Sequence, residues 1–218
     1  LKLRPKIIIF MTGLNDIGGT AQSRGNSMLS GVAARSRVAS VLVNLGRYLD
    51  ARKKGLVHEQ LDLKTLPRTS VDTPEEAKIL GRYGPQALEA YRARIEELIK
   101  VCRANSIEPV FVTQPALFGS GQDPATGISL EDVRVGDSNG AVSWKVLELY
   151  NDVLRAECAN QGVLCLDLAR KMPKDSRYYY DFYHFTPSGA EKVAELIYSE
   201  LKPFMSQKYP NFKRERTK

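Results

Sequence analysis

The feature that most constrains the fold of this chain is an alternation of short apolar runs with longer segments of helical spacing. The apolar runs are Lys6–Met11, Pro109–Thr113 and Val163–Asp167. Nearly continuous apolar runs of this length are typical of strands that are buried on both faces. Because strands alternate with helices along the chain, we expect βαβ units, and therefore an α/β fold with a central parallel sheet and helices on both of its faces.

Four segments carry apolar residues at the spacing of a helix, and they are 38–49, 85–105, 144–160 and 186–204. The apolar stripe of the second segment consists of Leu88, Tyr91, Ile95, Leu98, Ile99 and Cys102. Pro85 suits the first turn of that helix, and Thr186 is the predicted N-cap of the last one. Two stretches are predicted to be irregular: 56–84, which prolines and glycines interrupt, and 116–143, a long Gly-rich connection.

Polar residues follow each predicted strand, at the edge where parallel sheets bind their ligands. Asn15 follows the first strand, and its side-chain amide could donate to a developing oxyanion. Asp181 and His184 follow the third strand, and a carboxylate beside an imidazole fixes its tautomer and stabilises it once it is protonated. The pattern therefore predicts a hydrolytic site with His184 as general base, Asp181 as the group that orients it and Asn15 as oxyanion donor.

Two motifs resemble blocks of the SGNH (GDSL-type) hydrolases. Gly13-Leu14-Asn15-Asp16 resembles their Gly-x-Asn-Asp block, and Asp181-Phe182-Tyr183-His184 resembles their final Asp-x-x-His block. The strand end at Gln114 and the helix with Gly189 are also similar. The resemblance spans about residues 6–205. It implies a flavodoxin-like three-layer α/β/α sandwich.

The resemblance also implies hydrolysis or transfer of an acyl group through an acyl-serine, without a cofactor or a metal. Asp181, His184 and a serine would form the triad. Gly13 and Asp16 would support the oxyanion turn, and Gln114 and Tyr183 are predicted to contact the substrate, a small-molecule, lipid or acylated carbohydrate ester. We expect 1–205 to form one such domain, followed by a basic tail at 206–218.

The nucleophile is the missing part of this pattern. The Gly-Asp-Ser block of the family should precede Gly13, but only twelve residues do so here. We therefore expect the first strand, the serine and a second oxyanion donor to precede Leu1, as would any export signal, so the compartment stays open. Gly136-Asp137-Ser138 spells the triplet inside the Gly-rich connection, which makes Ser138 the less favoured nucleophile. The alternative function is a non-catalytic ligand-binding domain of this fold.

Charge and cysteine content set limits on partners and cofactors. The net charge is +7, and the basic residues gather at 35–54 and in the tail. The glycine pattern matches no phosphate-binding fingerprint, and basic residues are not interleaved with stacking aromatics, so no nucleic-acid partner is predicted. Membrane contact through 35–54 is not favoured, because Tyr48 is its one aromatic anchor. The three cysteines lie at no metal-ligand spacing, and a Cys158–Cys165 bridge is left open.

Overall fold

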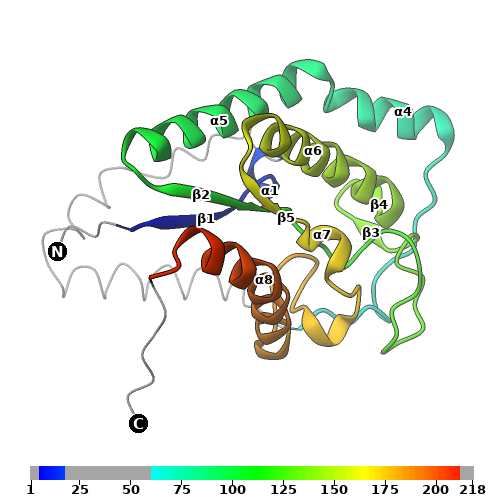
Figure 1. Cartoon of the computed structure of the whole chain (residues 1–218). Coiled ribbons are helices and arrows are strands. Elements are labelled where there is room, and N and C mark those ends of the chain that lie inside the picture. Colours follow the sequence, from blue (N-terminus) through cyan, green and yellow to red (C-terminus); the bar gives the residue numbers. More distant parts are fainter. Residues whose placement is uncertain (1–4, 18–59, 212–218) are drawn as a thin grey trace, which may run out of the picture. The chain divides into compact units, whose positions relative to one another are not determined.

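A parallel sheet of three strands organises the residues that the computed structural model describes, which are 5–17 and 60–211. The strands are β1 (Ile7–Met11), β2 (Glu108–Val112) and β5 (Leu164–Leu166), in the order β1-β2-β5 (Figure 1). All of them belong to one unit, which comprises Leu1–Ile17 and Leu61–Lys218. The parallel sheet confirms the predicted α/β fold.

The central strand β2 fixes the register of the sheet. Ile7 of β1 lies opposite Glu108, and Met11 lies opposite Val112. On the other side, Val112 lies opposite Leu166. Because side chains alternate along a strand, Val110 and Val112 face one helical layer and Phe111 faces the other.

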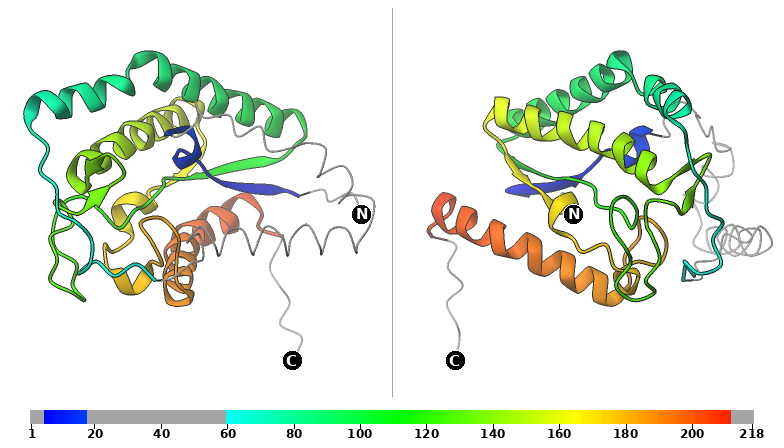
Figure 2. Two further views of the ribbon diagram at one scale, coloured as in Figure 1. Left: turned by 180° about the vertical axis from the view of Figure 1, so that it is seen from behind. Right: turned by 90° about the vertical axis from the view of Figure 1, so that its right-hand side faces the viewer.

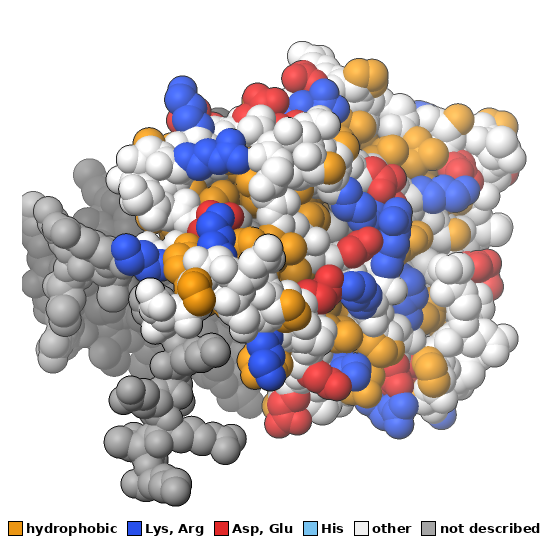
Figure 3. Space-filling view, in the orientation of Figure 1, with side chains coloured by type: hydrophobic (Ala, Val, Ile, Leu, Met, Phe, Trp, Pro, Cys, Tyr) orange, Lys and Arg blue, Asp and Glu red, His pale blue; other side chains and the backbone are white. Residues whose placement is uncertain are grey.

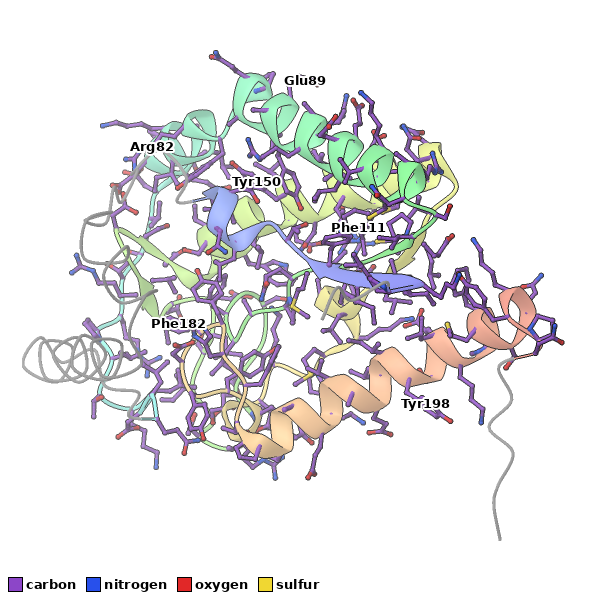
Figure 4. All side chains as sticks on the ribbon, turned by 90° about the vertical axis from the view of Figure 1, so that its left-hand side faces the viewer. Arg82, Glu89, Phe111, Tyr150, Phe182 and Tyr198 are labelled. Carbon is purple, nitrogen blue, oxygen red and sulfur yellow. The ribbon has the colours of Figure 1, made fainter. Side chains whose placement is uncertain are left out.

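One face of the sheet is covered by α5 (Pro85–Ala104) and α6 (Gly140–Gln161). Phe111 packs there against Tyr91 and Ile95 of α5 and Tyr150 of α6, and Figure 4 shows Phe111 and Tyr150 between the sheet and these helices. The stripe predicted for 85–105 is confirmed, since its members Tyr91, Ile95, Ile99 and Cys102 are buried.

The opposite face of the sheet packs against α8 (Pro187–Lys208), as the two further views show (Figure 2). Its apolar residues Val193, Leu196, Ile197, Leu201 and Phe204 pack against the cluster that contains Val110, Val112 and Leu166. Thr186 is the N-cap, and its hydroxyl accepts from the Gly189 N–H at 3.1 Å. The sheet thus lies between two helical layers, and the predicted start of the last helix is confirmed.

Strand β1 differs from the prediction of a strand buried on both faces. Ile9 is 44% exposed and Met11 is 37% exposed. Within the described part of the chain β1 is an outer strand, with β2 as its one neighbour. An apolar run identifies a strand, but it does not show how many neighbours that strand has.

Helix α4 (Thr73–Arg82) lies in the stretch 56–84 that was predicted to be irregular. The Asp72 side chain accepts from the Glu75 N–H at 2.9 Å and caps the helix. Pro74 stands in the first turn, where its missing N–H costs nothing. The proline that was interpreted as a break therefore begins the helix.

The Gly-rich connection 116–143 is also more regular than predicted. It contains an antiparallel hairpin of β3 (Arg134–Val135) and β4 (Ser138–Asn139). Helix α6 then begins at Gly140 instead of Trp144, because the Asn139 side chain caps the Val142 N–H at 2.9 Å.

The short elements are α1 (Leu14–Ile17), α7 (Leu168–Lys171) and the 3₁₀-helix η1 (Ser176–Tyr178). Cys158 and Cys165 are free thiols that hydrogen-bond to each other. No helix among the described residues has both the length and the apolar character to cross a membrane. The predicted helix 38–49, the basic segment 35–54 and most of the predicted tail lie outside the described residues.

Candidate active site

Asp181 and His184 are joined in the loop between η1 and α8. Asp181 Oδ2 lies 2.7 Å from His184 Nδ1. Asp181 Oδ1 accepts from the backbone N–H groups of Tyr183 at 2.7 Å and His184 at 2.8 Å. Burial alone raises the pKa of Asp181, but these three hydrogen bonds and the charge of His184 outweigh it, so the pKa lies below its usual range. The carboxylate is therefore held ionised beside the imidazole.

This hydrogen bond decides what the imidazole can do. A carboxylate at Nδ1 favours the tautomer that carries its proton on Nδ1, which leaves the lone pair on Nε2 to accept a proton. The same carboxylate stabilises the imidazolium that then forms. His184 is 63% exposed at its side chain, so a reacting group can approach it from solvent.

The loop that carries the pair is fixed at both ends. Tyr180 donates its N–H to the His184 carbonyl at 2.8 Å, and Tyr179 and Phe185 form an antiparallel bridge. Phe182 accepts from the Leu117 N–H at 2.9 Å, which ties the loop to the segment after β2. The Asp181–His184 pair therefore stands at the carboxyl edge of the sheet on a closed and tethered loop.

Asn15 stands at the same edge, in the single turn of α1 that follows β1. Gly13 has a φ of +119°, a conformation that favours glycine, and its carbonyl accepts from the N–H groups of Asp16 at 3.0 Å and Ile17 at 3.1 Å. Asp16 forms an ion pair with Arg94 of α5 at 2.6 Å. Asn15 is exposed. The turn thus presents Asn15 outwards, while its role as oxyanion donor stays a prediction.

Gln114 follows β2 and is buried. The Asn151 side chain of α6 accepts from its N–H at 2.9 Å and donates to its carbonyl at 3.1 Å. The Gln114 side-chain amide donates to the Pro115 carbonyl at 3.0 Å. In this arrangement the Gln114 amide serves the turn at the end of β2, and its contact with substrate stays a prediction.

A cavity of about 360 Å³ is lined in part by residues that are close in the chain to Asn15 and His184. Its walls include Ile17 of α1, Ile79 of α4, the α4 C-cap residue Tyr83, Ser138 of β4 and the loop residue Tyr183. Ile17 comes two positions after Asn15, and Tyr183 directly precedes His184, so the surroundings of both motifs meet at this cavity. Tyr183, a predicted substrate contact, is thereby placed in its wall.

The sequence prediction missed the part of this cavity that α4 contributes. Ile79 and Tyr83 fall in the stretch 56–84, whose prolines and glycines predict irregular structure. A signal was present, because Asp72 followed three positions later by Glu75 is the signature of a capped helix start. Nothing local predicts that α4 lies against α6, since their contacts join segments that are distant in the sequence.

Ser138, the less favoured nucleophile, stands on β4 directly before α6. Its hydroxyl oxygen is buried and has no hydrogen-bond partner among the described residues. An activated serine needs a base within hydrogen-bonding distance. Within 5–17 and 60–211, no imidazole forms a hydrogen bond with the Ser138 hydroxyl.

Charges on the described surface are largely paired. Arg155 contacts Glu148 at 3.2 Å, Asp152 at 2.6 Å and Asp167 at 2.8 Å, and Arg170 adds further contacts to the same carboxylates. Lys and Arg side chains mingle with Asp and Glu over the face shown in Figure 3. No group of three or more His, Cys, Asp or Glu side chains in the described ranges could hold a metal ion.

Comparison with known proteins does not assign a function to this chain. No family model and no curated protein matches this sequence. Among solved structures, the chain is similar to a GDSL-like lipase from Bacteroides thetaiotaomicron, with 15% identity and a TM-score of 0.38. The match covers 62% of this chain and 60% of that lipase. The residues of this chain must therefore carry any functional proposal.

Asp123 links the 116–143 connection to the segment that leads into the site. Its carboxylate is buried and accepts from Ser176 N at 2.8 Å, Ser176 Oγ at 2.9 Å, Thr126 N at 3.0 Å and Thr126 Oγ1 at 2.6 Å. Burial raises the pKa of Asp123, but these hydrogen bonds outweigh it and hold the pKa below its usual range. Asp123 therefore stabilises the fold while it is ionised.

We expect Asp123→Asn to lower the free energy of unfolding by about 2 kcal/mol at pH 7. Because the folded pKa is the lower one, this stabilisation is fully present above the unfolded pKa of ~3.9 and is lost as the pH falls through the folded pKa. Urea unfolding at pH 7 and near pH 3 measures the difference. The exposed Asp132→Asn is the control. If the free energy of unfolding differs between Asp123→Asn and wild type by the same amount at both pH values, Asp123 does not stabilise the fold through its ionised form.

Proposed function

We propose that this protein is an ester hydrolase or acyl transferase that works through a Ser-His-Asp triad. His184 is the general base, Asp181 orients it, and Asn15 donates to the oxyanion. The observation that carries the proposal is the 2.7 Å contact between Asp181 and His184 Nδ1, with Asp181 also held by two backbone N–H groups. The proposed substrates are small-molecule, lipid or acylated carbohydrate esters.

We infer that the nucleophilic serine of this proposal lies outside the described residues. Its hydroxyl proton passes to His184 Nε2 while its oxygen bonds to the ester carbonyl carbon, and Asp181 stabilises the imidazolium. Asn15 donates to the oxygen that becomes negative, an interaction that contributes about 3 kcal/mol in comparable sites. His184 then returns the proton to the leaving alkoxide. Water or an acceptor alcohol removes the acyl group by the same steps in reverse.

A fluorophosphonate probe tests this proposal, because it bonds covalently to activated serines. We expect the full-length protein to be labelled on one serine other than Ser138, which mass spectrometry of the digested protein locates. His184→Ala should abolish labelling, since the serine then has no base. Labelling that is equally fast in His184→Ala would count against the triad. A wild-type protein that is folded but never labelled would favour the ligand-binding alternative.

Ser138→Ala separates the two candidate nucleophiles within the same experiment. We expect this variant to be labelled as fast as wild type, and to unfold at a higher temperature because a buried hydroxyl without a partner is removed. The gain should be about 1 kcal/mol, or roughly 2–4 °C in Tm. Ser176→Ala is the matched control and should lose stability, because the Ser176 hydroxyl donates to Asp123. A folded Ser138→Ala that is no longer labelled would make Ser138 the nucleophile.

A further inference from the structure

The cavity described above is placed to receive one arm of a bound ester. Ile17, just past Asn15, forms one part of its wall, and Phe182 and Tyr183, just before His184, form another. An ester carbonyl held between the Asn15 amide and the His184 imidazole has an acyl arm and an alcohol arm. One of these arms can enter the cavity, because Ile17, which is close to Asn15 in the chain, and Phe182 and Tyr183, which precede His184, line it.

The lining suits an uncharged and apolar group. Ile17, Ile79, Val146, Leu147 and Phe182 supply hydrocarbon walls. The one carboxylate in the lining, Asp137, forms an ion pair with Arg82 at 2.7 Å, so its charge is compensated. Figure 4 shows Arg82 at the end of α4 and Phe182 in the loop region below it.

The lining contains two tyrosine hydroxyls, those of Tyr83 and Tyr183, and the Tyr183 hydroxyl stays neutral. Burial, and next the nearby Asp181 carboxylate, raise the pKa of Tyr183 to about 12. At neutral pH the cavity therefore offers a charged ligand no uncompensated partner among the described residues.

The volume sets the length of the apolar group. A methylene group occupies about the volume of a water molecule, ~30 Å³. A cavity of about 360 Å³ that is filled to about two-thirds therefore holds a chain of about eight carbons. Each methylene group that enters should tighten binding about fourfold.

We propose that this cavity binds an unbranched alkyl arm of about eight carbons from the ester substrate. The inference rests on the proposed function, because that function places the ester carbonyl between Asn15 and His184. The arm can come from the acyl group or from the alcohol, and both sources share the same chemistry. The cavity thus selects for chain length.

Binding without turnover tests this inference. Isothermal titration of the full-length protein with straight-chain carboxylates and with straight-chain 1-alkanols, from two to twelve carbons, compares the two sources. We expect affinity to rise about fourfold per methylene group to about eight carbons and then to level off. Stronger binding in the carboxylate series assigns the cavity to the acyl arm of the ester. Stronger binding in the alkanol series assigns it to the alcohol arm. Affinity that does not change with length in either series overturns the proposal.

Two variants fill the cavity from half-buried positions of its wall, Val135→Trp on β3 and Ser143→Phe on α6. Each should weaken octanoate or octanol binding at least tenfold, while Val101→Trp, at a 50% exposed position of α5, should leave it unchanged. Circular dichroism identifies the variants that fold. A folded Val135→Trp or Ser143→Phe that binds the eight-carbon ligand as tightly as wild type overturns the proposal.

The inference and the proposed function can fail separately. His184→Ala keeps the cavity walls, so its affinity should still rise about fourfold per methylene group, although the head group of the ligand loses its contact with the imidazole. If the wild-type protein binds this ligand but never hydrolyses octanoyl or octyl esters, the proposed function fails and the cavity remains a binding site for alkyl chains. If it hydrolyses esters at rates that do not depend on chain length, the cavity proposal fails and the triad stands.

Discussion

His184→Ala in the full-length protein is expected to lower kcat for p-nitrophenyl acetate by about four to six orders of magnitude. The reason is that Nε2 of His184 would be the one acceptor for the serine proton, while Asp181 occupies Nδ1. KM should change much less, because the imidazole acts mainly in the transition state. Initial rates at saturating and at low ester concentrations separate the two constants.

Asp181→Asn provides the sharper comparison, because an amide has nearly the same shape as the carboxylate. It should lower kcat by about 10⁴-fold, since an amide N–H facing Nδ1 favours the wrong tautomer of His184. Asp132→Asn makes the same chemical change at an exposed position and should leave kcat unchanged. If His184→Ala or Asp181→Asn keeps a rate within tenfold of wild type, the triad is excluded and the ligand-binding alternative gains.

The Asp181–His184 pair could be predicted from sequence because its contacts are local. The Asp181 carboxylate accepts from the backbone N–H groups of Tyr183 and His184, which come two and three positions later in the chain. An Asp side chain commonly forms hydrogen bonds with the backbone over this range. The N-cap Thr186 is local in the same sense. A four-residue motif and a helix start therefore predicted the pairing of Asp181 with His184 and the start of α8, whereas the structure adds that Nδ1 of His184 faces the carboxylate.

The cavity could not be predicted in this way, because it joins segments that are far apart in the sequence. Ile79 and Ser138 face the same space as Phe182, although each belongs to a different element. The exposure of β1 has a similar origin. Apolar character predicts a strand, whereas burial depends on which strands and helices lie beside it, and that is decided by packing across the whole unit.

A second large effect is expected at Gly189, in the first turn of α8. A Cβ at this position would come 1.9 Å from the Tyr178 carbonyl oxygen, a backbone atom that cannot turn aside. Thr186 ties the same two segments together, since its N–H donates to Tyr178 O at 3.0 Å and its hydroxyl donates to Arg177 O at 2.8 Å. Gly189 therefore permits the close approach that holds the start of α8 against the segment before the loop that carries Asp181 and His184.

Gly189→Ala is expected to lower the free energy of unfolding by about 3 kcal/mol, or roughly 6–12 °C in Tm. Folded protein should also lose turnover, because separating α8 from Tyr178 strains the bridge between Tyr179 and Phe185 that closes the loop around Asp181 and His184. Thermal unfolding and the initial rate at 25 °C measure the two effects.

Gly81→Ala in α4 is the matched control, because nothing lies within 4 Å of a Cβ at that position. Alanine is the better helix former by about 1 kcal/mol, so this variant should be slightly more stable than wild type. The same substitution should thus raise Tm at one glycine and lower it strongly at the other. Equal effects at both positions would mean that α8 can move away from Tyr178 at little cost, and the loop that positions His184 would then not depend on that contact.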